Sequence, residues 1–322
     1  MNEQSKFIVD YPGGLMSRDL RIEYEGAFHH VINRGYHKMI IFEGKEDFHY
    51  FLKCLEEVFQ SHVLILHAYC LMNNHFHLFT ETPNANLSKA MHRLETKYAI
   101  YFKKKYNHDG KVFQRRYKAF LVDTNTYALD LMRYIHRNPE NVIVQNSEEW
   151  LYSSYRAYLG LSDKPDFLDT NLVLNNFDID RSKAIDKFKN HMQQEEASQW
   201  SPEDLIVGKS ILGAKNFIER IKNKLPEGIN TELAGLIHLK GDEKVEPIKV
   251  FISKLPYDSK LKKDLLLYGL RKKTYLNRQA ISEILAESLT NPTISNRIRR
   301  TKEKATKDLK LAKVLIELDR VF

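Results

Sequence analysis

The chain has 322 residues, of which 43% are hydrophobic and 29% are charged, and its formal net charge is +8. This length suits two or three domains, and the composition excludes a chain that is disordered throughout. No apolar run approaches the ~20 residues that a membrane span needs, and the N-terminus lacks the pattern of a signal peptide. Two cysteines, Cys54 and Cys70, are too few for a disulfide scaffold. We therefore expect a cytoplasmic protein with no membrane partner.

The basic residues are concentrated in two segments. Lys97–Lys118 holds eight lysines and arginines against one acidic residue, and Lys262–Lys310 holds 13 against five. The rest of the chain is acidic overall. This distribution favours a nucleic-acid partner over an evenly solvated basic surface, and it predicts association with the nucleoid.

Hydrophobic periodicity in the first half alternates between strands and helices. The expected strands are Phe28–Asn33, Val63–Leu71, His75–Glu81 and Tyr117–Asp123. The expected helices are Lys45–Gln60, Leu87–Tyr106 and Asn125–Asn138. The order β-α-β-β-α-β followed by a helix predicts the α+β class. It is typical of a ferredoxin-like split βαβ fold, with an antiparallel sheet and helices on one face.

The pattern changes near Leu159–Pro165, after which helical periodicity dominates. We expect a first domain over residues 16–160 and an all-α region over residues 166–322, with a helix-turn-helix-like module at about 261–310. The expected helices of this region are Ser182–Glu195, Ser201–Ile206, Ala214–Leu225, Thr231–Leu239, Pro247–Leu255, Lys260–Leu270, Asn277–Ala286 and Thr293–Asp319.

The triplet His75-Phe76-His77 lies on an expected strand. Side chains at positions i and i+2 point to the same face, so both imidazoles can approach one metal ion while Phe76 enters the packed face. Two histidines hold a divalent ion only with a further ligand from elsewhere. The alternative is a pair of half-exposed strand histidines with no ligand.

Tyr134 and Asn138 are four residues apart on an expected helix, so their side chains lie one above the other at the border of its apolar face. A tyrosine hydroxyl is a weak nucleophile at its ordinary pKa, and a metal ion that polarises a target phosphate would compensate. The alternative for Tyr134 is ordinary packing, which is the usual role of tyrosine.

Two segments carry candidate DNA-binding residues. The segment KVFQRRYKAF interleaves basic and aromatic side chains, which suits a nucleic-acid backbone and its bases. Near the C-terminus, the helix TISNRIRRTKEK follows a polar turn, as the second helix of a helix-turn-helix does. The alternatives are a basic loop and an ordinary helix pair. The candidate contacts are Lys111, Gln114, Arg115, Arg116, Lys118, Ser295, Asn296, Arg299, Arg300 and Lys302.

Taken together, the segments AFHHVINRG, LMNNHFHLFTETPNANLSKAMHRL, VFQRRYKAFLVD and LMRYIHRNPENV resemble the single-tyrosine HUH transposases. The nearest branch is the chromosomal, REP-associated tyrosine transposase type. The resemblance covers about Met16–Gly160. It extends more weakly to the C-terminal region, which is similar to the DnaA DNA-binding domain.

The resemblance implies a role for each matching residue. His75, His77 and Asn138 match metal ligands for Mg²⁺ or Mn²⁺, and Tyr134 matches the nucleophile. The implied reaction cleaves single-stranded DNA beside a hairpin, leaves a 5′-phosphotyrosine and a free 3′-OH, and rejoins strands by reversal. Where some relatives carry an acidic residue before the first histidine, this chain carries Asn74.

The resemblance also implies partners: single-stranded or hairpin DNA, and duplex DNA through the C-terminal region. Relatives complete the active site within one chain or with a partner's helix, so it leaves a homodimer open. Two other functions remain as alternatives. One is a non-catalytic DNA-binding protein or regulator that retains the fold. The other is a metal phosphohydrolase, although Phe79 stands where a histidine-triad enzyme has histidine.

Overall fold

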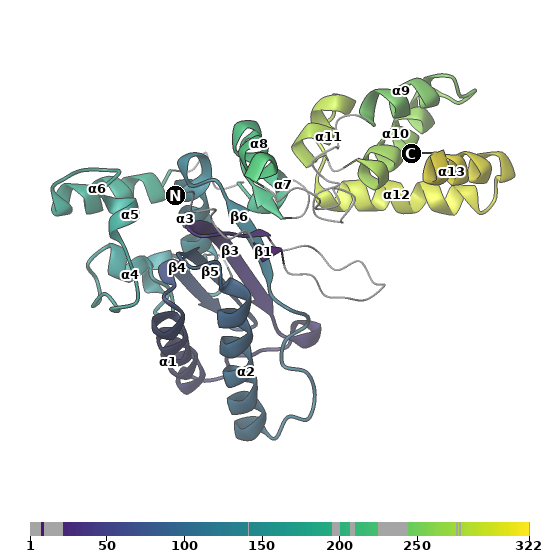
Figure 1. Cartoon of the computed structure of the whole chain (residues 1–322). Coiled ribbons are helices and arrows are strands. Elements are labelled where there is room, and N and C mark those ends of the chain that lie inside the picture. The colour runs from purple at the N-terminus through teal and green to yellow at the C-terminus, as the bar shows by residue number, and fades with distance from the viewer. Residues whose placement is uncertain are drawn as a thin grey trace. The chain divides into compact units, whose positions relative to one another are not determined.

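The computed structural model describes residues 8–9, 22–140, 142–194, 200–206, 210–224, 244–274, 276 and 278–321. The chain divides into two compact units, which are described separately. Unit 1 is built mainly from residues 21–202, and unit 2 mainly from residues 218–322 (Figure 1). None of the described helices is long and apolar enough to cross a membrane.

Unit 1 contains the predicted α+β fold. The described strands are β1 (Ile8–Val9), β2 (Ile22–Glu23), β3 (Ala27–Arg34), β4 (Ile65–Met72), β5 (His75–Thr82), β6 (Lys118–Val122) and β7 (Ile211–Leu212). The main sheet has the order β4-β5-β3-β6-β7, and its three long pairings are antiparallel. Strands β1 and β2 form a separate short pair.

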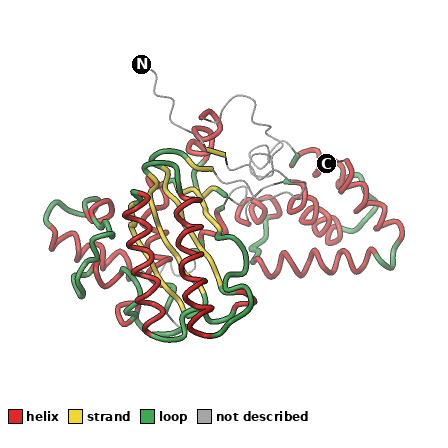
Figure 2. The backbone as a smooth tube through the Cα atoms, turned by 60° about the horizontal axis from the view of Figure 1, so that its bottom comes forward, coloured by secondary structure: helices red, strands yellow, loops and turns green. Residues whose placement is uncertain are grey.

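The helices of unit 1 are α1 (Lys45–His62), α2 (Leu87–Tyr106), α3 (Thr124–Arg137), α4 (Tyr155–Tyr158), α5 (Asn171–Leu174) and α6 (Arg181–Met192). Two short 3-10 helices, η1 (Tyr36–Lys38) and η2 (Ser147–Glu149), lie between them. Helices α1 and α2 run side by side across one face of the sheet (Figure 2). The predicted order and the helix-covered face are therefore confirmed, with element ends within about two residues of those expected.

The face under α1 and α2 holds the main core of unit 1. Phe76 is fully buried there, and its ring packs against Phe51 of α1 at a centroid separation of 5.0 Å. Helix α3 lies against the opposite face, because the ring of Tyr134 contacts His77, the neighbour of Phe76 on β5. Alternation along β5 thus sends Phe76 into the core and both flanking histidines to α3.

Unit 1 extends further along the chain than the expected boundary near 160–166. Helix α6 packs onto α3, since the buried ring of Phe188 lies 6.2 Å from that of His136. The edge strand β4 is also covered, because the amide of Asp169 donates to Leu66 O at 2.8 Å and Tyr158 Oη donates to His67 O at 2.8 Å. The chain after Gly160 therefore completes the first unit before it enters the second.

The remaining helices are α7 (Pro202–Leu205), α8 (Lys215–Lys224), α9 (Val245–Ser253), α10 (Ser259–Lys273), α11 (Arg278–Leu285), α12 (Asn291–Ala305) and α13 (Leu309–Val321). The all-α prediction for the C-terminal region is confirmed for α9 to α13, which pack around two small cores that include Leu265 and Leu270. The helix expected over Thr231–Leu239 lies outside the described residues.

The expectation of one helix over Thr293–Asp319 is wrong. Helix α12 ends at Ala305 and α13 begins at Leu309. Asp308 explains the break, because its Oδ1 accepts hydrogen bonds from the amides of Lys310 and Leu311. A side-chain oxygen that caps free amides starts a new helix at that point.

Candidate active site

The site lies between the start of β5 and the end of α3. Tyr134 and His77 are in edge-on ring contact at 5.6 Å, and His75 Nε2 lies 3.4 Å from Asn138 Oδ1. The structure therefore brings together all four residues that the sequence singled out. Asn138 directly follows the last residue of α3, and its Nδ2 donates to Tyr134 O at 3.4 Å.

The turn between β4 and β5 is held in place by the loop after β3. The amide of Gly35 donates to Asn74 O at 2.9 Å, and the amides of Ile41 and Phe42 both donate to Asn73 O. A Cβ at Gly35 would lie 2.2 Å from Met39 O, so only glycine permits this close approach. The backbone before His75 is thereby fixed.

The three histidines of the site are neutral at physiological pH. Burial, with a smaller contribution from the nearby Arg34, lowers the pKa of His75 to about 4. Burial also lowers the pKa of His30 to about 3 and holds the pKa of His77 well below its ordinary value. Neutral imidazole is the form that binds metal ions.

The hydrogen bonds of His75 test whether these residues fit a metal ion. Its Nδ1 lies 2.6 Å from Asn74 Oδ1, and Asn74 Nδ2 donates to Lys38 O, which leaves that oxygen as the acceptor. The neutral ring therefore carries its proton on Nδ1, and the lone pair of Nε2 faces the oxygen of Asn138. Two facing acceptors repel each other, and a cation bound to both would remove the repulsion. The donor set fits a divalent ion.

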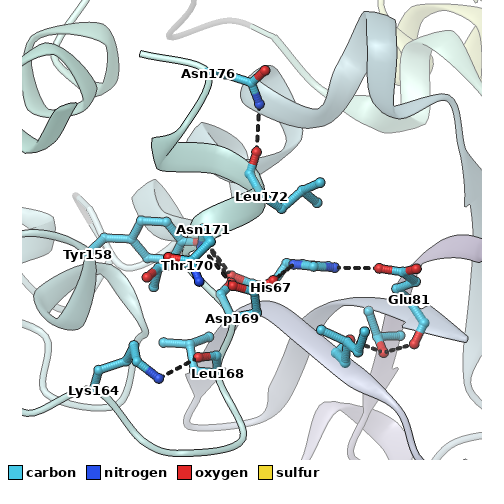
Figure 3. A network of polar contacts seen from close by, with 12 residues as sticks. His67, Glu81, Tyr158, Lys164, Leu168, Asp169, Thr170, Asn171, Leu172 and Asn176 are labelled. Atoms are coloured by element: carbon cyan, nitrogen blue, oxygen red, sulfur yellow. Dashed lines mark hydrogen bonds and ion pairs between the residues drawn. The ribbon is translucent and has the colours of Figure 1, made fainter. Parts of the chain in front are cut away.

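A second cluster of titratable side chains in unit 1, formed by His67, Glu81 and Asp169, does not form a metal site. His67 is buried, with Nε2 at 3.3 Å from Glu81 Oε2 and Nδ1 at 4.0 Å from Asp169 Oδ2 (Figure 3). Within the described residues, no group of three or more His, Cys, Asp or Glu side chains could hold a metal ion. The contacts of His67 instead hold the segment after Leu168 against β4.

The predicted DNA-binding residues are exposed in both segments. Between α2 and β6, Val112 and Tyr117 are buried, and the hydrogen bond from Gln114 N to Arg34 O at 2.9 Å ties this loop to β3. The exposed side chains of this loop and its strand are Lys111, Gln114, Arg115, Arg116 and Lys118. On α12, the exposed side chains are Ser295, Asn296, Arg299, Arg300 and Lys302.

Helix α12 follows α11 along the chain after a short connection. Thr290 caps α12, because its Oγ1 accepts from the amide of Thr293 at 3.2 Å, and Pro292 occupies the first turn. Arg297 faces inward and contacts Asp264 and Glu287. These contacts hold α12 against α10, and the polar face of α12 remains exposed to solvent.

Sequence reasoning does not reveal two features of the site, the hydrogen bond between Asn74 and His75 and the position of His30. Asn74 was noted as a neutral replacement, and its hydrogen bond to His75 was not foreseen. His30 on β3 was passed over, although its Nε2 lies 3.0 Å from His77 Nδ1. The signal for His30 was its position on an alternating strand, which gains meaning only once the register with β5 is known.

The sheet thus carries two histidines, His75 and His77, on β5, and a tyrosine, Tyr134, faces them from α3. Residues 19–138 match the family model described as "Transposase IS200 like". Over these residues the chain is similar to the IS200-like transposases. The chain is also similar to a solved REP-associated tyrosine transposase bound to a REP hairpin. The two are 15% identical over 48% of this chain and 94% of that one, with a TM-score of 0.38. The search of curated proteins finds no match.

Proposed function

We propose that the protein cleaves and rejoins single-stranded DNA next to hairpins through a covalent 5′-phosphotyrosine at Tyr134. The observation that carries this proposal is the convergence of Tyr134, His75, His77 and Asn138 on one face of the sheet. A transposase family match over the same residues supports it.

In the proposed reaction, Tyr134 Oη attacks the phosphorus of a backbone phosphodiester. The bond from phosphorus to the 3′ oxygen breaks, and the phenol proton ends on that oxygen as a free 3′-OH. One phosphodiester is exchanged for another, so no nucleotide cofactor is needed. Reversal by a 3′-OH rejoins strands and releases Tyr134.

His75, His77 and Asn138 would hold Mg²⁺ or Mn²⁺ beside the tyrosine. When bound, the ion polarises the phosphate and stabilises charge on the leaving oxygen. The protein's own residues supply the positions: Asn74 fixes the ring of His75, and the contact between Asn138 and Tyr134 O holds the ligand and the nucleophile on one helix end.

The two basic segments would bind the substrate. The loop from Lys111 to Lys118 is proposed to hold single-stranded or hairpin DNA near the site. The open face of α12, with Asn296 and Arg299, is proposed to bind duplex DNA as the second helix of a helix-turn-helix.

The test is a denaturing gel of the full chain with labelled single-stranded hairpin DNA, in Mn²⁺ or EDTA. We expect a metal-dependent band of protein linked to DNA, which is lost in Tyr134→Phe. Tyr127→Phe is the matched control, because Tyr127 lies on the same helix and should keep the band. DNA binding without any covalent band, across a panel of hairpins, would favour the non-catalytic DNA-binding alternative.

A further inference from the structure

His30 is a buried histidine that the proposed reaction does not use directly. It has 0% exposure and lies on β3, where it is paired with Phe79 of β5. His77 is paired with Ile32, so His30 and His77 are diagonal neighbours on the same face of the sheet. Their rings are stacked, with a centroid separation of 5.3 Å and an interplanar angle of 18°.

The two rings share one hydrogen bond, between His30 Nε2 and His77 Nδ1, at 3.0 Å. A hydrogen bond between two imidazole nitrogens needs a proton on one and a lone pair on the other. If His77 donates, its Nδ1 carries the proton and its Nε2 is left with the lone pair that a metal ion requires. If His30 donates, the proton of His77 moves to Nε2 and the ring cannot act as a ligand there.

We propose that His30 is a positioning residue that accepts the Nδ1 proton of His77 and so holds His77 in its metal-binding tautomer. This inference rests on the proposed metal site. Metal-binding histidines ordinarily donate their second ring nitrogen to a fixed acceptor, which sets both tautomer and orientation. His75 has such an acceptor in Asn74, and His30 gives His77 the equivalent partner.

The surroundings of His30 indicate this role in preference to that of a third ligand. Its Nε2 is engaged by His77, and its Nδ1 is buried with no hydrogen-bond partner among the described residues. Its ring also lies edge-on to Tyr134, at 6.1 Å between centroids. His30 therefore contacts both the proposed metal ligand His77 and the proposed nucleophile Tyr134.

The first test measures Mn²⁺ affinity of the full chain, from the electron paramagnetic resonance signal of free Mn²⁺. His30→Phe keeps an aromatic ring but removes the acceptor, and we expect roughly 10- to 100-fold weaker binding. His30→Gln places an amide oxygen near the position of Nε2 and should recover most of the loss. His29→Phe is the matched control, because buried His29 lies on the opposite face of the same strand and contacts Ile22 O. It should bind as the wild type does.

The second test reads the proton directly in the wild type, with Zn²⁺ as a diamagnetic probe and ¹⁵N-labelled histidine. We expect a proton on His77 Nδ1 and a coupling across the hydrogen bond to His30 Nε2. A proton on His30 Nε2 in the loaded protein, or wild-type affinity in a folded His30→Phe variant, would overturn the inference and leave the proposed reaction standing. A wild-type protein that binds neither Mn²⁺ nor Zn²⁺ would overturn both this inference and the proposed metal-dependent reaction.

Discussion

Replacing Asn74 tests how strongly the metal site depends on its support. In Asn74→Ala, His75 Nδ1 loses the oxygen that lies 2.6 Å away, and its ring is free to take the other tautomer or to rotate. A hydrogen bond of this kind contributes about 1 kcal/mol net, and reorganisation of the ring adds to the loss. We expect Mn²⁺ binding to weaken by about tenfold, which corresponds to about 1.4 kcal/mol.

The reverse substitution sharpens the test. Asn74→Asp keeps an acceptor in the same place and gives it a charge, which roughly doubles the strength of such a hydrogen bond. We therefore expect Mn²⁺ to bind more tightly than in the wild type, by up to about tenfold. Asn73→Ala is the control from the same turn, because Asn73 is exposed and contributes its backbone oxygen to the fold.

Mn²⁺ affinity would be measured for all four proteins by isothermal titration calorimetry under one buffer condition. Equal affinity in Asn74→Ala and the wild type would refute the reasoning, because the fixed tautomer of His75 would then not matter. Weaker binding by Asn74→Asp would refute the claim that residue 74 acts as an acceptor toward His75.

Three further predictions concern other parts of the chain. Gly35→Ala should lower the free energy of unfolding by about 1–3 kcal/mol, because its Cβ would lie 2.2 Å from Met39 O; an unchanged urea midpoint would count against that close approach. Stability should fall as pH drops below about 6.5, since burial lowers the pKa of His30 and His136 to about 3 in the folded chain and the unfolded state then binds more protons. Two such groups amount to about 3 kcal/mol between pH 6.5 and 5, and equal denaturant midpoints at these two values would contradict this. Replacing both Arg300 and Lys302 by alanine should reduce the salt slope of duplex binding by about 2, whereas Lys313→Ala on α13 should leave it unchanged; an unaltered slope in the double variant would exclude α12 as the DNA-binding face.

The strands and helices of unit 1 could be predicted from the sequence because hydrophobic residues recur along them with the regular spacing of a strand or a helix. The alternation of His75, Phe76 and His77 placed one side chain in the core and two on the other face, as the structure has them. The spacing of Tyr134 and Asn138 likewise predicted that both reach one side of α3. Local periodicity is sufficient for such features.

Other features depend on contacts between distant segments. The role of His30 depends on the register of β3 against β5. That register brings His30 next to His77, although the two residues are 47 positions apart in sequence. The break between α12 and α13 depends on one capping carboxylate, at Asp308, within a pattern that is otherwise continuously helical. Because Phe188 packs onto His136, unit 1 extends beyond the change in hydrophobic periodicity near residue 160.

The central claim is that Tyr134 forms a covalent bond with DNA, and peptide mapping of the adduct tests it most directly. The full chain would be incubated with hairpin DNA and Mn²⁺, digested with protease and nuclease, and analysed by mass spectrometry. We predict a nucleotide on the peptide that carries Tyr134, joined through its 5′ phosphate. A nucleotide on any other residue, or an adduct that persists in Tyr134→Phe, would contradict the account.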